Sequence, residues 1–137
     1  AYHAELNALL VADGRHVVAL DFSNGASRAA KPWACGFSKA YGIAVGASGK
    51  ILVTDAGAHK CHEFASDARP VAVWGSGAPG NADGDAAHAA FDEPLGASAE
   101  PGTTSWYVCC YGGAHESGSV CALTPTAFAV VPPDWTM

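Results

Sequence analysis

Side-chain oxygens alternate along a glycine-rich segment, and such oxygens are the ligands that calcium prefers. In the stretch GSGAPGNADGDAAHAAFDEPLG, residues 75–96, they belong to Asn81, Asp83 and Asp85, with Gly84 permitting a sharp turn. No glutamate ends a loop of the EF-hand type, which has roughly 12 residues. Calcium binding therefore stands as an alternative to a solvent-exposed connector turn. A phosphate cradle is excluded, because the GxxxxGK[ST] motif and its strand–loop–helix context are missing.

A second set of candidate ligands lies in the tetrapeptide HKCH, residues 59–62. On a strand, His59 and His62 point to opposite faces, so they suit joint metal binding badly. Either imidazole can still meet His16 and His115, which stand at comparable places elsewhere in the chain. Two interpretations of these histidines remain. They are exposed or hydrogen-bonded residues in turns, or several of them together bind zinc.

The five cysteines show no CxxC spacing, and their odd number makes a poor disulfide framework and a poor zinc site. We expect free, partly buried thiols in a reducing compartment, cytoplasmic or other. Cys109 and Cys110 should point to opposite faces if they lie on a strand. The spacing supports neither a redox pair nor a metal pair. No Ser-His-Asp or Cys-His arrangement can be placed, so no catalytic residue is assigned.

The elements that must position these side chains are short apolar runs bounded by turn residues. Helical periodicity is absent, and runs rich in β-branched and aromatic residues follow one another at spacings of roughly 8–12 residues. This pattern predicts an all-β fold: a sandwich, a barrel or a propeller. The runs are residues 8–12, 17–20, 43–45, 51–53, 71–74, 106–108, 120–123 and 128–131.

An internal repeat favours the propeller among these folds. Residues 9–25 (LLVADGRHVVALDFSNG) and 51–68 (ILVTDAGAHKCHEFASDA) both run from an apolar strand to an aspartate, a turn, and a strand that ends in phenylalanine. Asp55 follows Asp13 by 42 positions. A period of about 40–45 residues is typical of a four-stranded propeller blade.

The repeated aspartates predict structural pairs across the turns. Residues 13–16 (DGRH) predict a turn in which Asp13 pairs with the basic residues that follow it, and Asp55 is expected to pair with Lys60. Such a carboxylate holds its hairpin in place, although a surface ion pair contributes only about 0–1 kcal/mol. A third, weaker copy of the repeat spans residues 105–125.

The unit from residue 42 to residue 96 resembles an NHL repeat. Ala58 and Lys60 stand where that family usually has asparagine and arginine. The resemblance extends less closely to residues 9–25 and to the chain after residue 102. The matching elements are GIAV at 42–45, Asp55, His59-Lys60, Phe64, Asp83-Gly84, and the Ala-x-Phe-x-x-Pro-x-Gly pattern at 89–96.

The resemblance implies an all-β fold of about three blades of a β-propeller. We expect blade one at about 1–40, blade two at about 41–84 and blade three at about 85–137, with a connector at 75–96. Three blades do not close a ring of about six. Because a blade buries its faces only against its neighbours, more chain, a copy of the chain or another subunit should complete the ring. The start without methionine predicts a processed chain or a piece of a longer one.

The connector interpretation explains the composition of residues 75–96. Phe91 is the only large apolar residue between Trp74 and Leu95. We expect it to be buried between the second and third blades, where it anchors the connector. Residues 81–85 should stay exposed, and Pro94 should deliver the chain into the next inner strand.

Charge and composition narrow the function. The net charge is −6 and the seven basic residues are scattered, which argues against a nucleic-acid partner. No apolar run approaches the roughly 18 residues of a membrane span. Propellers of the resembled family commonly bind proteins. The first hypothesis is therefore a non-enzymatic protein-interaction or scaffold module with a protein partner and no cofactor. The alternative is a metal-dependent propeller hydrolase or lyase, with calcium or zinc in the central channel.

Overall fold

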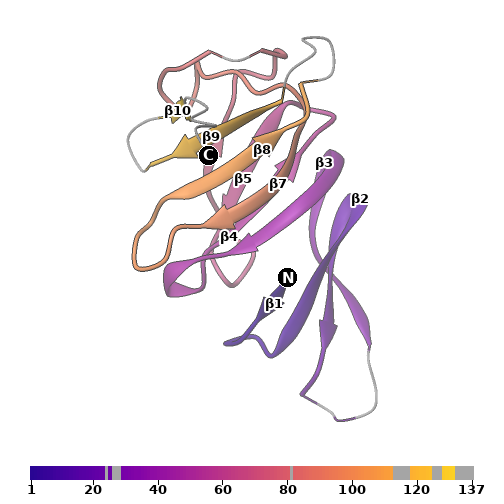
Figure 1. Cartoon of the computed structure of the whole chain (residues 1–137). Coiled ribbons are helices and arrows are strands. Elements are labelled where there is room, and N and C mark those ends of the chain that lie inside the picture. The colour runs from indigo at the N-terminus through magenta and orange to yellow at the C-terminus, as the bar shows by residue number, and fades with distance from the viewer. Residues whose placement is uncertain (24, 26–28, 81, 113–117, 125–127, 132–137) are drawn as a thin grey trace.

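The computed structural model folds into antiparallel sheets, which confirms the predicted all-β class (Figure 1). The structure describes residues 1–23, 25, 29–80, 82–112, 118–124 and 128–131. A 3-10 turn, η1 (Ala47–Gly49), lies between β3 and β4. The strands are β1 (Tyr2–His3), β2 (Ala8–Asp21), β3 (Ala30–Val45), β4 (Ile51–Asp55), β5 (Lys60–Phe64), β6 (Pro70–Trp74), β7 (Pro94–Ala99), β8 (Trp106–Cys110), β9 (Ser119–Leu123) and β10 (Phe128–Val131).

Strands that follow one another in the chain are neighbours in two sheets. The first sheet has the order β1-β2-β3-β4-β5-β6, and the second has the order β7-β8-β9-β10. Neither sheet closes on itself among the described residues. Figure 1 shows β3 between β2 and strands β7 and β8, while β4 and β5 overlap β7 and β8 in this view. The described part of the chain contains no helix long and apolar enough to cross a membrane.

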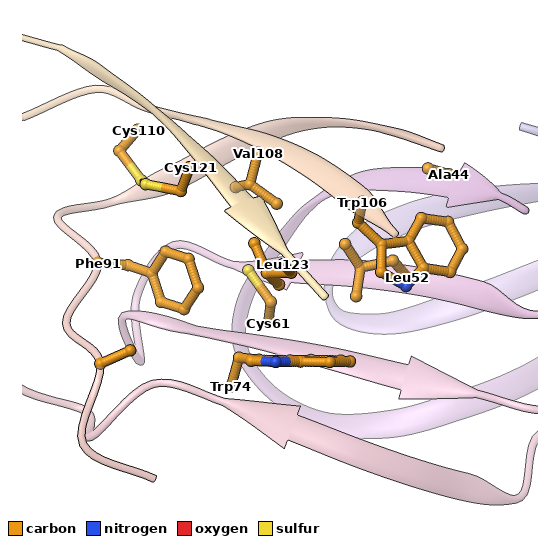
Figure 2. Packing of buried hydrophobic residues seen from close by; sticks show 11 residues of the cluster. Ala44, Leu52, Cys61, Trp74, Phe91, Trp106, Val108, Cys110, Cys121 and Leu123 are labelled. Atoms are coloured by element: carbon orange, nitrogen blue, oxygen red, sulfur yellow. The ribbon is translucent and has the colours of Figure 1, made fainter. Parts of the chain in front are cut away.

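Strand β4 is buried along its whole length because both of its faces are covered. Side chains alternate along a strand. Ile51 and Val53 therefore point to the side of β2 and the first part of β3, where they pack with Leu10, Val17 and other apolar residues. Leu52 points the opposite way, into a second cluster with residues of β8 and β9 (Figure 2).

The two sheets touch most closely where β7 lies along β3 and β4. The hydroxyl of Thr54 donates to the carbonyl oxygen of Leu95 at 2.6 Å and accepts from the N–H of Gly42 at 2.8 Å. A Cβ atom at position 42 would lie 2.0 Å from that Leu95 oxygen. Gly42, the glycine of the GIAV motif, thus allows the backbones of β3 and β7 to approach each other closely.

The predicted turn at residues 13–16 is wrong. Strand β2 runs through these residues, and Gly14 pairs with Ala40 on β3 while His16 pairs with Cys35. The register shifts between the two pairs, and Gly14 has a φ of +59°, as in a β-bulge. The physical reason is that β3 is 16 residues long and offers hydrogen-bond partners beyond this point, so the chain bends without turning back.

Candidate functional site

Asp55 is a buried structural carboxylate at the end of β4. Its Oδ2 accepts the N–H of Ser38 at 2.8 Å, and its Oδ1 accepts the N–H groups of Lys39 at 2.7 Å and Ala58 at 3.2 Å. The expected ion pair with Lys60 is not formed within 4.0 Å. Asp55 therefore holds its hairpin turn, as expected of such an aspartate, but through backbone groups. It also ties that turn to β3.

Asp13, at the corresponding place of the first copy, has no such role. It is exposed, and within the described residues it has no ion pair with Arg15 or His16. The difference follows from the continuous strand β2: without a turn at residues 13–16, no cluster of free N–H groups faces the carboxylate.

The two histidines of the HKCH stretch are held separately. His59 has a φ of +54°, and its Nδ1 accepts the N–H of Glu93 at 3.1 Å. The half-buried ring of His62 packs edge-on against Phe37 and stacks on Phe64. Burial lowers the pKa of His62, and Lys60 lowers it further against an opposing effect of Asp55. His59 therefore fastens the connector, while His62 serves as an aromatic side chain.

The acidic part of the connector is an exposed turn. Oδ1 of Asp85 accepts the N–H groups of Ala87 and His88, and it lies 2.6 Å from Nδ1 of His88. The hydrogen bonds from His88 lower the pKa of the Asp85 carboxyl group. Asp83 is exposed, and Asn81 lies outside the described residues. In the described ranges, no three His, Cys, Asp or Glu side chains converge in a way that could hold a metal ion.

Phe91 is fully buried, as the sequence predicts. It lies in the cluster that joins the two sheets, beside Trp74 of the first and Cys121 of the second (Figure 2). The connector is also bonded to itself, since the N–H of Gly75 donates to Ala86 O and the N–H of Gly80 donates to Phe91 O. Pro94 is the first residue of β7, where it was expected to lead into the next strand.

Sequence reasoning missed a polar contact inside this apolar interface. Glu63 is buried, and its Oε2 accepts the indole N–H of Trp106 at 2.8 Å, while its Oε1 lies 3.3 Å from Lys50 Nζ. Glu63 is two residues after Cys61 on β5, so alternation alone puts it on the inward face. A carboxylate at an inward-facing position indicates a buried polar contact. The sequence does not identify the partner, Trp106, which lies 43 residues away.

A second missed residue is His3, which fixes the N-terminal strand. It is buried, and its Nε2 lies 2.7 Å from the carbonyl oxygen of Gly49. Its Nδ1 accepts the N–H of Leu6 at 3.3 Å, so Nε2 carries the proton and donates to Gly49. The imidazole is thus used on both sides as a structural link.

The predicted alternation at the cysteine pair is confirmed. On β8, Cys109 is exposed and Cys110 is buried, as are Cys61 and Cys121. Near them, Oδ2 of the buried Asp92 has no hydrogen-bond partner among the described residues. Cys61, Cys110 and Cys121 lie in the apolar cluster between the two sheets.

The outward face of the second sheet is an uncharged surface outside this core. Strands β7, β8 and β9 contain no Asp, Glu, Lys, Arg or His. Tyr107 is 38% exposed and Val120 is 36% exposed on the side that faces away from the first sheet. Because an antiparallel sheet facing water usually alternates apolar and polar residues, this face has the composition of a contact surface.

No known family model matches the chain, and no curated protein matches it significantly. The resemblance to an NHL repeat therefore rests on the sequence motifs, which match most closely in residues 42–96.

Proposed function

We propose that the chain is a protein-interaction or scaffold module built on part of an NHL-like propeller. Two features support the propeller. The last four strands of the first sheet, β3 to β6, and the four strands β7 to β10 each form an antiparallel meander in chain order. The connector then leads from the outer strand β6 to β7, which lies beside β3 and β4. Consecutive propeller blades have this relation of outer strand to next inner strand.

The observation that carries the binding function is the uncharged outward face of β7, β8 and β9. Its exposed members include Tyr107, Cys109 and Val120. The opposite face of the same sheet buries its apolar residues against the first sheet. In repeat proteins, each unit packs against its neighbours on both sides. One face of the second sheet packs on the first sheet, so its uncharged outer face is suited to pack against a further sheet of the same kind.

The proposed occupant is therefore a further repeat sheet, supplied by a second copy of the chain or by another protein. Packing would follow the internal interface, where small residues of one sheet meet an aromatic side chain of the other, as Gly46 meets Trp106. Strands β7, β8 and β9 offer no Lys or Arg for phosphate contacts, which favours a protein over RNA as the partner.

Light scattering during size-exclusion chromatography, over a range of concentrations, tests a second copy as the occupant. We expect association that is lost in the double variant Tyr107→Lys and Val120→Lys. Val71→Lys is the matched control, because Val71 is exposed on β6, away from this face. A second arm purifies the tagged chain with its bound partners and repeats the purification with both variants. Association unaffected by the double variant, or recovery of RNA alone in a salt-sensitive manner, would contradict the proposal.

The alternative function is a metal-dependent hydrolase or lyase that uses His59, His62, Asp83 or Asp85. Elemental analysis of the purified protein separates the two functions. Stoichiometric zinc or calcium that is lost in His59→Ala or Asp83→Ala, together with an activity, would favour the enzyme. A folded, metal-free protein that binds its partner through the second sheet would favour the module.

A further inference from the structure

Two buried thiols face each other across strands β8 and β9. The sulfur atoms of Cys110 and Cys121 are 3.8 Å apart. Cys110 pairs with Ser119 in the strand register, and Cys121 pairs with Val108, so the two cysteines are diagonal neighbours on the inward face. Both are free thiols. Figure 2 shows the side chains of Cys110 and Cys121 pointing toward each other, with Cys61 farther along the same cluster.

This geometry is close to that of a disulfide. A disulfide needs an S–S distance of about 2.05 Å. Diagonal neighbours on antiparallel strands lie about 7–8 Å apart, slightly beyond the usual Cα separation of about 4.4–6.8 Å across a disulfide. Closing the remaining gap therefore requires a rotation of the two side chains and a small strand adjustment, without a change of register.

The two sulfurs are chemically unequal. The hydrogen bond from the Cys121 thiol lowers the pKa of Cys110, and the backbone N–H of Asp92 acts in the same direction against the effect of burial. Donating that bond, together with burial, raises the pKa of Cys121. Burial also raises the pKa of Cys61. Cys110 is therefore expected to ionise more readily than Cys121.

Cys110 is also the member of the pair closer to solvent. It is the last residue of β8 and is followed by Tyr111, which is 66% exposed. Cys110 itself retains 4% of its surface, and Cys121 retains none. A small oxidant that approaches from the end of β8 reaches Cys110 first.

We propose that Cys110 and Cys121 form an oxidation site at which hydrogen peroxide produces an intrachain disulfide. The Cys110 thiolate attacks one peroxide oxygen, the O–O bond breaks, and hydroxide leaves, which gives a sulfenic acid at Cys110. The sulfur of Cys121 then attacks the sulfur of Cys110, the S–O bond breaks, and the hydroxyl leaves as water with the Cys121 proton. Two thiols are oxidised to one disulfide, and one peroxide is reduced to two waters.

Mass spectrometry after peroxide treatment tests the site in the folded full chain. The Cys109→Ser variant serves as the parent, so that a linkage at Cys110 is unambiguous. Free thiols are alkylated, and the chain is cut after Glu116, which separates Cys110 from Cys121 in the sequence. We expect the two fragments to stay joined and to have lost two hydrogen atoms, with Cys61 still alkylated. Dithiothreitol should restore both thiols.

Single variants separate the two steps. Cys121→Ser should abolish the linkage and leave a sulfenic acid at Cys110 that dimedone traps. Cys110→Ser should abolish both the linkage and the trapped product. Cys35→Ser, a change at an exposed cysteine, should leave the linkage unchanged. Circular dichroism checks that each variant folds. Peroxide treatment in denaturant is the second control, because in the unfolded chain any two cysteines can form the disulfide.

Three outcomes would overturn the inference. The first is a folded parent in which Cys61 is oxidised as fast as Cys110. The second is a linkage found only between molecules, through Cys35. The third is a Cys110–Cys121 linkage that forms no more selectively in the folded protein than in denaturant.

Discussion

The indole N–H of Trp106 on β8 donates a 2.8 Å hydrogen bond to the carboxylate of Glu63 on β5, inside the interface between the two sheets. Both side chains are buried, and Lys50 reaches the other carboxylate oxygen from the rim. Together with the bond from the Thr54 hydroxyl to Leu95 O, this bond helps to fix how one sheet lies on the other, because apolar contacts are not directional.

Glu63→Leu should lower the free energy of unfolding by about 1.5–3 kcal/mol, since it leaves the Trp106 N–H without its charged acceptor. Glu63→Gln should cost only about 0–1 kcal/mol, because the amide oxygen can still accept from Trp106 and the partly exposed Lys50 pair is screened by solvent. Urea unfolding of the two variants measures both values. Equal losses would mean that the Trp106 bond does not account for the stability.

Phe91→Ala should cost about 3–5 kcal/mol, the usual range for a buried phenylalanine. Tyr111→Ala is the matched control, because that ring is 66% exposed, and its effect should stay within about 0.5 kcal/mol. Asp85→Ala should have a much smaller effect than Phe91→Ala. Denaturant melts compare the three variants. If Phe91→Ala melts like the parent and Asp85→Ala unfolds, the segment is a ligand or ion site and not a connector.

Asp55→Ala should cost about 1.5–3 kcal/mol or more, because three backbone N–H groups lose a charged acceptor. Asp13→Ala provides the control at the corresponding place in the repeat. It should stay within about 0.5 kcal/mol, since Asp13 is exposed on a continuous strand. Thermal and urea unfolding measure the difference. Similar losses of stability in the two variants would mean that Asp13 and Asp55 have the same structural role, as the sequence repeat suggests.

Gly42→Ala should cost about 1–3 kcal/mol, because the added Cβ would overlap the carbonyl oxygen of Leu95 and force the sheets apart. Gly96→Ala, on β7 itself, has no atom within 4 Å of the added Cβ and should cause no loss. Unfolding curves of the two variants provide the comparison. A loss confined to Gly96→Ala would contradict the close contact between β3 and β7.

Stability should fall as the pH is lowered through about 6.5, in part through His62. The folded-state pKa of this residue is lowered by burial, so the unfolded chain binds its proton more readily. The stabilisation is present above the unfolded pKa of about 6.5 and is lost as the pH falls towards the folded value. In His62→Phe, which keeps a ring beside Phe37 and Phe64, the melting temperature should fall less between pH 8 and pH 5.5. An unchanged pH dependence would contradict this role.

What the sequence determined by itself follows from local periodicity. Short β-branched runs between turn residues specify strands, and alternation along a strand specifies the face of each side chain. The all-β class, the opposite faces of Cys109 and Cys110, and the burial of Phe91 could all be predicted in this way. Each of these properties depends on a residue and its near neighbours in the chain.

Tertiary structure decided everything that depends on how strands and sheets are placed. The similar stretches around Asp13 and Asp55 differ because one continues along β3 and the other turns back, so the carboxylates have different partners. The bond from Trp106 to Glu63 spans 43 residues, and the approach of Cys110 to Cys121 depends on the register of β8 with β9. Local pattern sets which face a side chain occupies, but register and sheet packing, which are properties of the whole chain, set what it meets there.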